Sequence, residues 1–253
     1  MNVSSLLASS PLWSTGRLVE IGTAWGGLAL HLLDTLPKLR VTAVDPFLGG
    51  YDRGDLMSNF LGKLQARHGL SAEQVSSRRA AAMAHELHTA HGCRYRLRNA
   101  KSTDAAPSVA NGSVAVLFID GARVPRTARP RVPAAARRRR AAPRARGSSR
   151  RCGAPMRRAH APRHPRAGDH TLHGVLADIA AWLPKVAPGG LVLFNDFGGP
   201  FRHKYGVRAA VWRSFGGGSA AVGPGAKWAV FQSGAGETNA YVTVPESGNG
   251  FME

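Results

Sequence analysis

Long apolar segments are missing from this sequence of 253 residues. No apolar run approaches the roughly 20 residues that a membrane-spanning helix needs, so we expect no membrane partner. The stretch 1–16 is weakly apolar and lacks the early basic residues of a secretory signal. Cysteine is scarce as well, because Cys93 and Cys152 give neither a disulfide framework nor a metal-ligand spacing. These absences predict a protein of a reducing compartment, and we expect it in the cytoplasm.

Acidic residues are missing from one long segment. Positions 122–168 hold 16 of the 34 basic residues, all of them arginine. The remaining 18 basic residues face 15 acidic residues, so the net charge of +19 belongs largely to this segment. Arg, Ala and Pro make up 35 of its 47 residues and follow no helical or strand period. This composition predicts a disordered insert within a single domain spanning 1–253.

Two interpretations of segment 122–168 follow from its composition. It is either an insertion without a function of its own, such as translated intron or out-of-frame sequence, or an Arg-rich arm that binds RNA or another polyanion. The segment contains no Phe, Trp or Tyr, the residues that stack on single-stranded bases. We therefore favour the first interpretation. The second keeps open a polyanion-binding protein as an alternative function.

The stretch 18–46 organises the rest of the chain. Residues 18–21 form an apolar run typical of a buried parallel strand. A turn containing Gly22 follows, then apolar residues recur at helical spacing from 28 to 36, and a second strand at 41–44 ends on Asp45. A glycine turn before a helix lets the backbone approach a ligand closely. An acidic residue at the tip of the next strand is suited to accept hydrogen bonds from a ribose.

Two cofactor classes use this arrangement. A dinucleotide-binding motif would match Gly22, Ala24 and Gly27, with Ala24 in the place of the middle glycine. That match leaves a nicotinamide-dependent oxidoreductase as an alternative. The first motif of S-adenosylmethionine-dependent methyltransferases matches Glu20, Gly22 and Gly26, again with Ala24 in the middle place. The turn alone does not decide between the two classes.

Strands and helices alternate through most of the chain. We expect helices at 56–68, 71–91, 171–183 and 205–215, and strands at 93–97, 114–119 and 191–194. The end differs, because 227–233 and 240–245 are two strand-like runs joined by a short polar loop. The fold class is therefore α/β, a doubly wound, mostly parallel seven-stranded sheet with a C-terminal antiparallel hairpin. Such a hairpin is not expected of a dinucleotide-binding domain.

Three histidines of the helix expected at 71–91 share one face. His85, His88 and His91 recur at a spacing of three, which would suit a metal site. No Cys or Asp nearby completes a metal shell, so we favour a solvated helix face.

The sequence resembles a known family. VEIGTAWGG at 19–27, VTAVDPF at 41–47, VLFIDG at 116–121 and the run from 169 to 197 are similar to class I S-adenosylmethionine-dependent methyltransferases. Within this class the resemblance is to small-molecule and sugar O-methyltransferases that carry a continuous I-D-G-D-H motif. It covers residues 17–245 apart from the insert. Here 122–168 separates I-D-G from D-H, and removing it restores the family's order.

The resemblance implies S-adenosylmethionine as the cofactor and a small-molecule or sugar-like methyl acceptor. The residues expected to contact the cofactor are Glu20, Gly22, Thr23, Gly26, Asp45 and Ser102. The turn residues would approach the methionine part while Glu20 holds the turn. Asp45 would accept the ribose hydroxyls, and Ser102 would lie near the adenine.

Methyl transfer to a hydroxyl requires that the acceptor be positioned and its proton removed. Asp120 and the pair Asn195-Asp196 follow strands that are neighbours in this sheet type, and their oxygens suit Mg²⁺. A divalent cation there would lower the pKa of the acceptor hydroxyl. Asp169 or His170 would act as the general base. Because the insert directly precedes both residues, we expect a methyltransferase fold whose activity the insert impairs.

Overall fold

The structure is a computed structural model that describes residues 2–47, 56–120, 171–198, 206–216, 227–232 and 238–246. These residues all belong to one compact unit, which is formed by 1–125 and 165–253. The insert at 122–168 and the predicted bases Asp169 and His170 lie outside the described residues. Among the helices that are described, none has the length and apolar character to cross a membrane.

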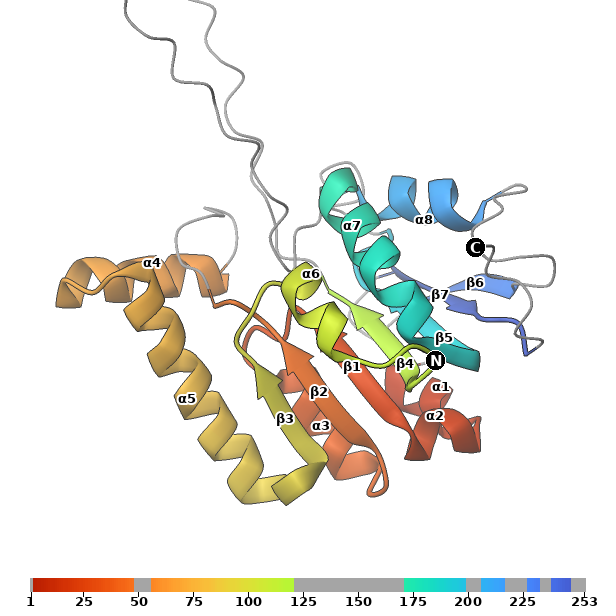
Figure 1. The fold of residues 1–253 in the computed structure, drawn as a ribbon, viewed down its shortest axis with the longest axis horizontal. Coiled ribbons are helices and arrows are strands. Elements are labelled where there is room, and N and C mark those ends of the chain that lie inside the picture. The colour runs from red at the N-terminus through yellow and green to blue at the C-terminus, as the bar shows by residue number, and fades with distance from the viewer. Residues whose placement is uncertain are drawn as a thin grey trace, which may run out of the picture. The chain divides into compact units, whose positions relative to one another are not determined.

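Seven strands form one sheet in the order β3-β2-β1-β4-β5-β7-β6 (Figure 1). The strands are β1 Arg17–Ile21, β2 Arg40–Val44, β3 Tyr95–Arg98, β4 Val114–Ile119, β5 Val186–Phe194, β6 Lys227–Gln232 and β7 Thr238–Thr243. The pairs among β1 to β5 are parallel, whereas β7 pairs antiparallel with both β5 and β6. The predicted fold class, including the C-terminal hairpin, is therefore confirmed.

The helices connect the strands and follow the sequence pattern closely. They are α1 Val3–Ala8, α2 Pro11–Thr15, α3 Gly27–Thr35, α4 Leu56–His68, α5 Ala72–His91, α6 Ser102–Ala105, α7 Leu172–Trp182 and α8 Val207–Phe215. Polar side chains fix two of the starts. Ser71 and Gln74 form a reciprocal capping box at α5, and the Thr171 hydroxyl accepts the Gly174 N–H at α7. Both starts agree with the sequence prediction.

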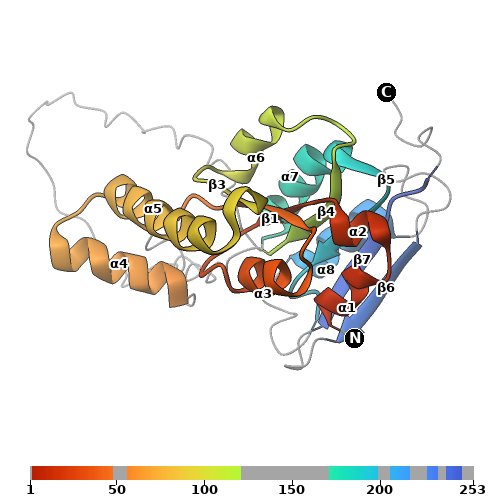
Figure 2. The same cartoon turned by 90° about the horizontal axis from the view of Figure 1, so that it is seen from below.

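Each face of the sheet is covered by its own set of helices (Figure 2). Alternate residues along β1 illustrate the division, because Val19 and Ile21 pack against α6, α7 and α8, whereas Leu18 packs against α1, α3 and α5. Strands covered on both sides read as nearly continuous apolar runs, and all six residues of β4 are buried. Because the strands themselves are buried, polar functional side chains are expected in the loops that follow the strand ends.

The structure departs from the predicted boundaries at two strands. β3 begins at Tyr95 because residues 92–94 form a 3₁₀ turn. β5 begins at Val186, five residues before the predicted start, and takes in Pro188, Gly189 and Gly190. Its pairing with β4 shifts register between Val114 and Val116. A shift of this kind admits a proline and glycines that ordinary ladder pairing disfavours.

We predict that residues 122–168 are dispensable for folding. Every strand of the sheet comes from outside this segment, and β4 and α7, which flank it, pack in the same core. Deleting 122–168 should leave the far-UV circular dichroism per folded residue unchanged and should not lower the melting temperature. In the full-length chain, limited proteolysis should cut first between β4 and α7. A deletion variant that unfolds would contradict the prediction.

Candidate functional site

Four residues, three of them polar, lie side by side where the central strands end. The parallel ladder continues one residue beyond the strands, so that Asp120 N–H donates to Ile21 O at 2.9 Å and Asn195 N–H donates to Ile119 O at 3.0 Å. On the other side, Gly22 N–H donates to Val44 O and Asp45 N–H to Arg98 O. The backbone therefore fixes these residues along one edge. Carboxyl edges of open α/β sheets are where ligands bind.

Strained backbone is confined to this edge. Ala24, Phe47 and Asp196 have φ values of 47°, 46° and 55°, and no other non-glycine residue among those described has a positive φ. Each follows the end of a strand, β1, β2 and β5 respectively. A positive φ costs free energy in residues other than glycine, and such residues cluster at ligand-binding sites.

The Asp45 carboxylate holds two loops together. Its Oδ2 accepts the Ala24 N–H at 3.0 Å, and its Oδ1 accepts the Phe47 N–H at 2.7 Å. These bonds satisfy two backbone donors in the strained loops after β1 and β2. Asp45 thus lies against the glycine turn and is partly exposed.

Glu20 lies beneath the same turn. It is 2% exposed, and its Oε2 accepts the Thr23 hydroxyl at 2.8 Å. The pKa of Glu20 is raised to about 8, chiefly by burial; the Thr23 hydrogen bond lowers it, and the nearby charges of Asp120 and Asp45 add to the rise. At neutral pH the carboxyl therefore keeps its proton. The predicted role of Glu20 in holding the turn agrees with this contact.

Asp120 and Asn195 meet across β4 and β5. The Asn195 Nδ2 donates to Asp120 Oδ1 at 3.0 Å, and both side chains are partly buried. Asp196 follows in the left-handed conformation. The structure thus brings together the first two of the three residues predicted to bind Mg²⁺. No cluster of three His, Cys, Asp or Glu side chains with metal-binding geometry occurs in the described part of the chain.

Ser102 occupies a different environment from the one expected. The residue is fully buried, and its hydroxyl donates to Asp178 Oδ1 at 2.5 Å and accepts the Trp182 Nε1–H at 2.9 Å. The side chain is therefore committed to the packing of α6 on α7. Any contact of this turn with adenine would have to come from atoms other than the Ser102 hydroxyl.

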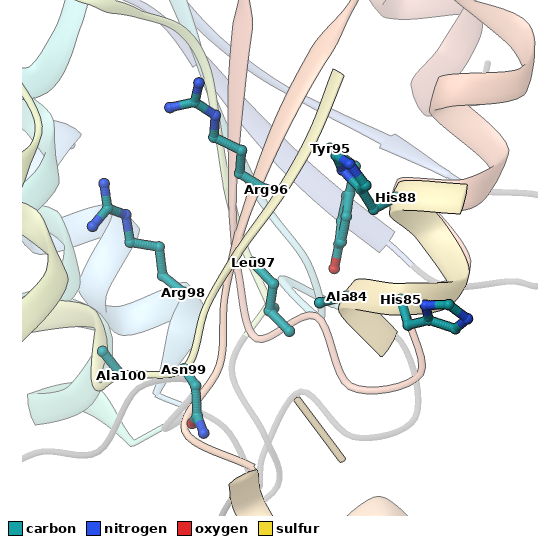
Figure 3. Close-up of a pocket in the computed structure, with 9 residues that line it drawn as sticks. All are labelled: Ala84, His85, His88, Tyr95, Arg96, Leu97, Arg98, Asn99 and Ala100. Atoms are coloured by element: carbon teal, nitrogen blue, oxygen red, sulfur yellow. The ribbon is translucent and has the colours of Figure 1, made fainter. Parts of the chain in front are cut away.

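A cavity of about 670 Å³ lies along the edge strand β3, beside α5 (Figure 3). Tyr95 and Leu97 point from β3 toward α5, whereas Arg96 and Arg98 point to the opposite side of the strand. The charged groups that line it therefore do not converge on one point. His85 and His88 also line it and are solvent-exposed, as predicted for a solvated face. The Nε2 of His91 instead lies 3.5 Å from Asp34 Oδ1, and its Nδ1 accepts a hydrogen bond from Arg94 Nη2.

Comparisons with known proteins agree with this geometry. Residues 19–143 match the family model described as a methyltransferase domain. Rv0187 from MTB, solved with its cofactor bound, superposes with a TM-score of 0.51 at 12% identity, covering 96% of this chain and 79% of that one. A Corynebacterium glutamicum protein gives 0.49 at 16%, and the O-methyltransferase TomG from Streptomyces achromogenes gives 0.47 at 12%, each with the same coverages. No curated protein matches the chain.

The family match over residues 19–143 and the fold together support a methyltransferase. The family match covers the cofactor turn, β2 and β4, and the sheet order with its antiparallel β7 supplies the fold. The prediction made from the motifs is thereby confirmed, and the nicotinamide-dependent oxidoreductase is not favoured.

Sequence reasoning missed part of the neighbourhood of the turn. Trp25 contacts Phe60 of α4 and Arg79 of α5, and the sequence pattern predicts neither contact. The available signal was Trp25 itself, a large aromatic among the small residues of GTAWGG. Its partners lie 35 and 54 positions further on, and only the folded chain brings them together.

We predict a pH-dependent stability that is traceable to Glu20. The folded chain holds this proton up to pH about 8, whereas the unfolded chain loses it near the ordinary value of 4.5. Between these values the folded chain binds more protons, so its stability falls as pH rises. Glu20→Gln removes this titration. Relative to the unmodified chain, the variant should gain on the order of 2–4 kcal/mol between pH 5 and pH 8.

Urea unfolding at several pH values measures this difference. Glu86→Gln is the matched control, because Glu86 is solvent-exposed on α5. The control should follow the unmodified chain at every pH. Parallel pH profiles for Glu20→Gln and the unmodified chain would rule out a raised pKa.

Proposed function

We propose that this chain transfers a methyl group from S-adenosylmethionine to a hydroxyl of a small-molecule acceptor. One observation carries the proposal: the turn after β1 is held from below by Glu20 and from the side by Asp45, at the carboxyl edge of the sheet. Gly22 has a positive φ and no Cβ, so its backbone can approach a ligand closely, whereas Gly26 leaves room for Leu87 and Met83 of α5. We assign the ribose hydroxyls to the Asp45 carboxylate, which lies against this turn.

The charge of this edge favours a sulfonium over a pyrophosphate. Asp45 and Asp120 are near enough to Glu20 to raise its pKa, so three carboxyl groups share the site. A cationic sulfonium lowers the repulsion among them, whereas the two negative charges of a pyrophosphate would add to it. This argument supports S-adenosylmethionine and disfavours NAD.

The methyl acceptor must be held in position, and a base must remove the proton of its hydroxyl. S-adenosylmethionine, when bound, supplies an electrophilic methyl group, and the protein supplies orientation. Asp120 and Asn195 are tied to each other at the end of the adjacent strands, where they would orient an acceptor oxygen. Asp169 or His170, outside the described residues, remains the predicted base. Titles of several similar structures name O-methyltransferases, which agrees with a hydroxyl acceptor.

The same edge offers ligands for Mg²⁺. The oxygens of Asp120, Asn195 and Asp196 are of the kind that this cation prefers. The amide of Asn195 presents its nitrogen to Asp120, so it would have to turn over to offer its oxygen. Mg²⁺ held there would lower the pKa of the acceptor hydroxyl. The residues therefore fit the cation in type, and the metal remains a proposal.

The cofactor proposal predicts that Asp45→Ala binds S-adenosylhomocysteine more weakly by about 1–3 kcal/mol, the range for losing a partner of buried polar groups. Isothermal titration calorimetry measures the affinity directly. Asp34→Ala, a change on the exposed end of α3, is the control and should leave it unchanged. Affinity for NAD should be negligible in all three proteins. Unchanged binding in Asp45→Ala would overturn the assignment.

The metal proposal predicts that methyl transfer by the deletion variant lacking 122–168 is lost in EDTA and restored by Mg²⁺. Asp196→Ala should lose activity while it keeps its affinity for S-adenosylhomocysteine, because the cofactor contacts are elsewhere. Formation of S-adenosylhomocysteine with a panel of phenols measures the activity. Transfer that survives both EDTA and Asp196→Ala would exclude the cation. The Asp169→Asn variant separately tests the base.

A further inference from the structure

Trp25 is the largest side chain of the cofactor turn and is not needed to build it. Its neighbours Thr23, Ala24, Gly26 and Gly27 are all small, and the turn packs on the core through Ala24 and through Gly26, which lies against Leu87 and Met83. Trp25 is 51% exposed, although exposing an aromatic ring of this size is unfavourable in water. The packing of the turn therefore gives no reason for a tryptophan here.

Two side chains from the α4–α5 segment approach the Trp25 ring. The Phe60 ring of α4 lies 5.2 Å from it between centroids at an interplanar angle of 52°, and Phe60 is itself 39% exposed. The guanidinium carbon of Arg79 lies 5.3 Å from the centroid of the Trp25 ring. Two inclined, half-exposed rings and a cation thus share one surface. We call these three residues the Trp25 platform.

The Arg79 guanidinium has an N–H donor that no described residue accepts. Within the described residues, no carboxylate oxygen lies within 4.0 Å of its guanidinium. Its Nε is buried and makes no hydrogen bond to any described residue. A buried donor without an acceptor costs free energy, and guanidinium groups bind carboxylates in a bidentate manner. The charge of Arg79 is therefore placed to receive an anionic group.

The platform adjoins the cofactor turn by covalent connection. Trp25 directly follows Ala24, whose N–H is bound by Asp45, and precedes Gly26, the N-cap of α3. A molecule resting on Trp25 is thus next to the cofactor. Its surface suits a flat apolar ring, because the hydroxyls of a sugar would find only the indole N–H as a polar partner on the two rings.

We propose that the Trp25 platform binds the methyl acceptor, and that the acceptor is an aromatic ring carrying a carboxylate. The ring packs against Trp25 and Phe60, and the carboxylate pairs with Arg79. This inference rests on the proposed methyltransferase function and names the class of its substrate.

Calorimetric titration of the full-length chain with saturating S-adenosylhomocysteine tests the proposal. The probes are 4-hydroxybenzoate, phenol, which lacks the carboxylate, and glucuronate, which lacks the aromatic ring. We expect 4-hydroxybenzoate to bind at least tenfold more tightly than either. Arg79→Gln should remove that preference and leave phenol binding unchanged, and Arg78→Gln, a change at the exposed neighbouring position, should have no effect. Phe60→Ala should weaken both aromatic probes.

The outcomes separate this inference from the proposed function. If the unmodified chain does not bind S-adenosylhomocysteine, the proposed function fails. If it binds the cofactor but shows no preference for 4-hydroxybenzoate, only the acceptor assignment fails. Weaker S-adenosylhomocysteine binding in Arg79→Gln would assign Arg79 to the cofactor and overturn the platform. Arg79→Lys, which keeps the charge, and thermal melting of each variant identify any loss that is due to misfolding.

Discussion

The turn after β1 depends on two acidic side chains that accept hydrogen bonds from its polar groups. Asp45 accepts N–H groups from both strained loops, and Glu20 accepts the Thr23 hydroxyl from below. Without them, backbone donors at a half-buried edge would be unpaired, at a cost comparable to the strain of the left-handed residues there. Asp45 and Glu20 therefore stabilise the conformation of this edge.

The cost of this arrangement is electrostatic. Glu20, Asp45 and Asp120 gather at the ends of three adjacent strands, because a parallel sheet directs all its carboxyl ends to one side. Burial leaves Glu20 with a raised pKa, so the protein keeps one of the three neutral at physiological pH. The other two acids, Asp45 and Asp120, supply the negative charge that suits a cation. Such charge arrangements are common where proteins bind ligands rather than where they only fold.

The sequence predicted most of the fold because its signals are local. Apolar runs gave β1, β2 and β4, and Ser71 marked the start of α5. It placed the start of β5 too late because Pro188 and two glycines ordinarily end a strand, and only the register shift against β4 accommodates them. For the site, motif positions found Glu20, Asp45 and the Asp120–Asn195 pair. They missed the commitment of Ser102 to Asp178, a contact across 76 positions that no local pattern encodes.

Proton and cofactor binding at this edge must be linked. A sulfonium near Glu20 stabilises the ionised carboxylate and so lowers the pKa that burial has raised. By thermodynamic reciprocity, the ionised form then binds the cation more tightly than the protonated form does. S-adenosylhomocysteine carries no such charge, so product formation would return the proton to Glu20. The carboxyl that shapes the turn would thereby favour the charged substrate over the neutral product, and the free energy needed to ionise a buried group would limit that preference.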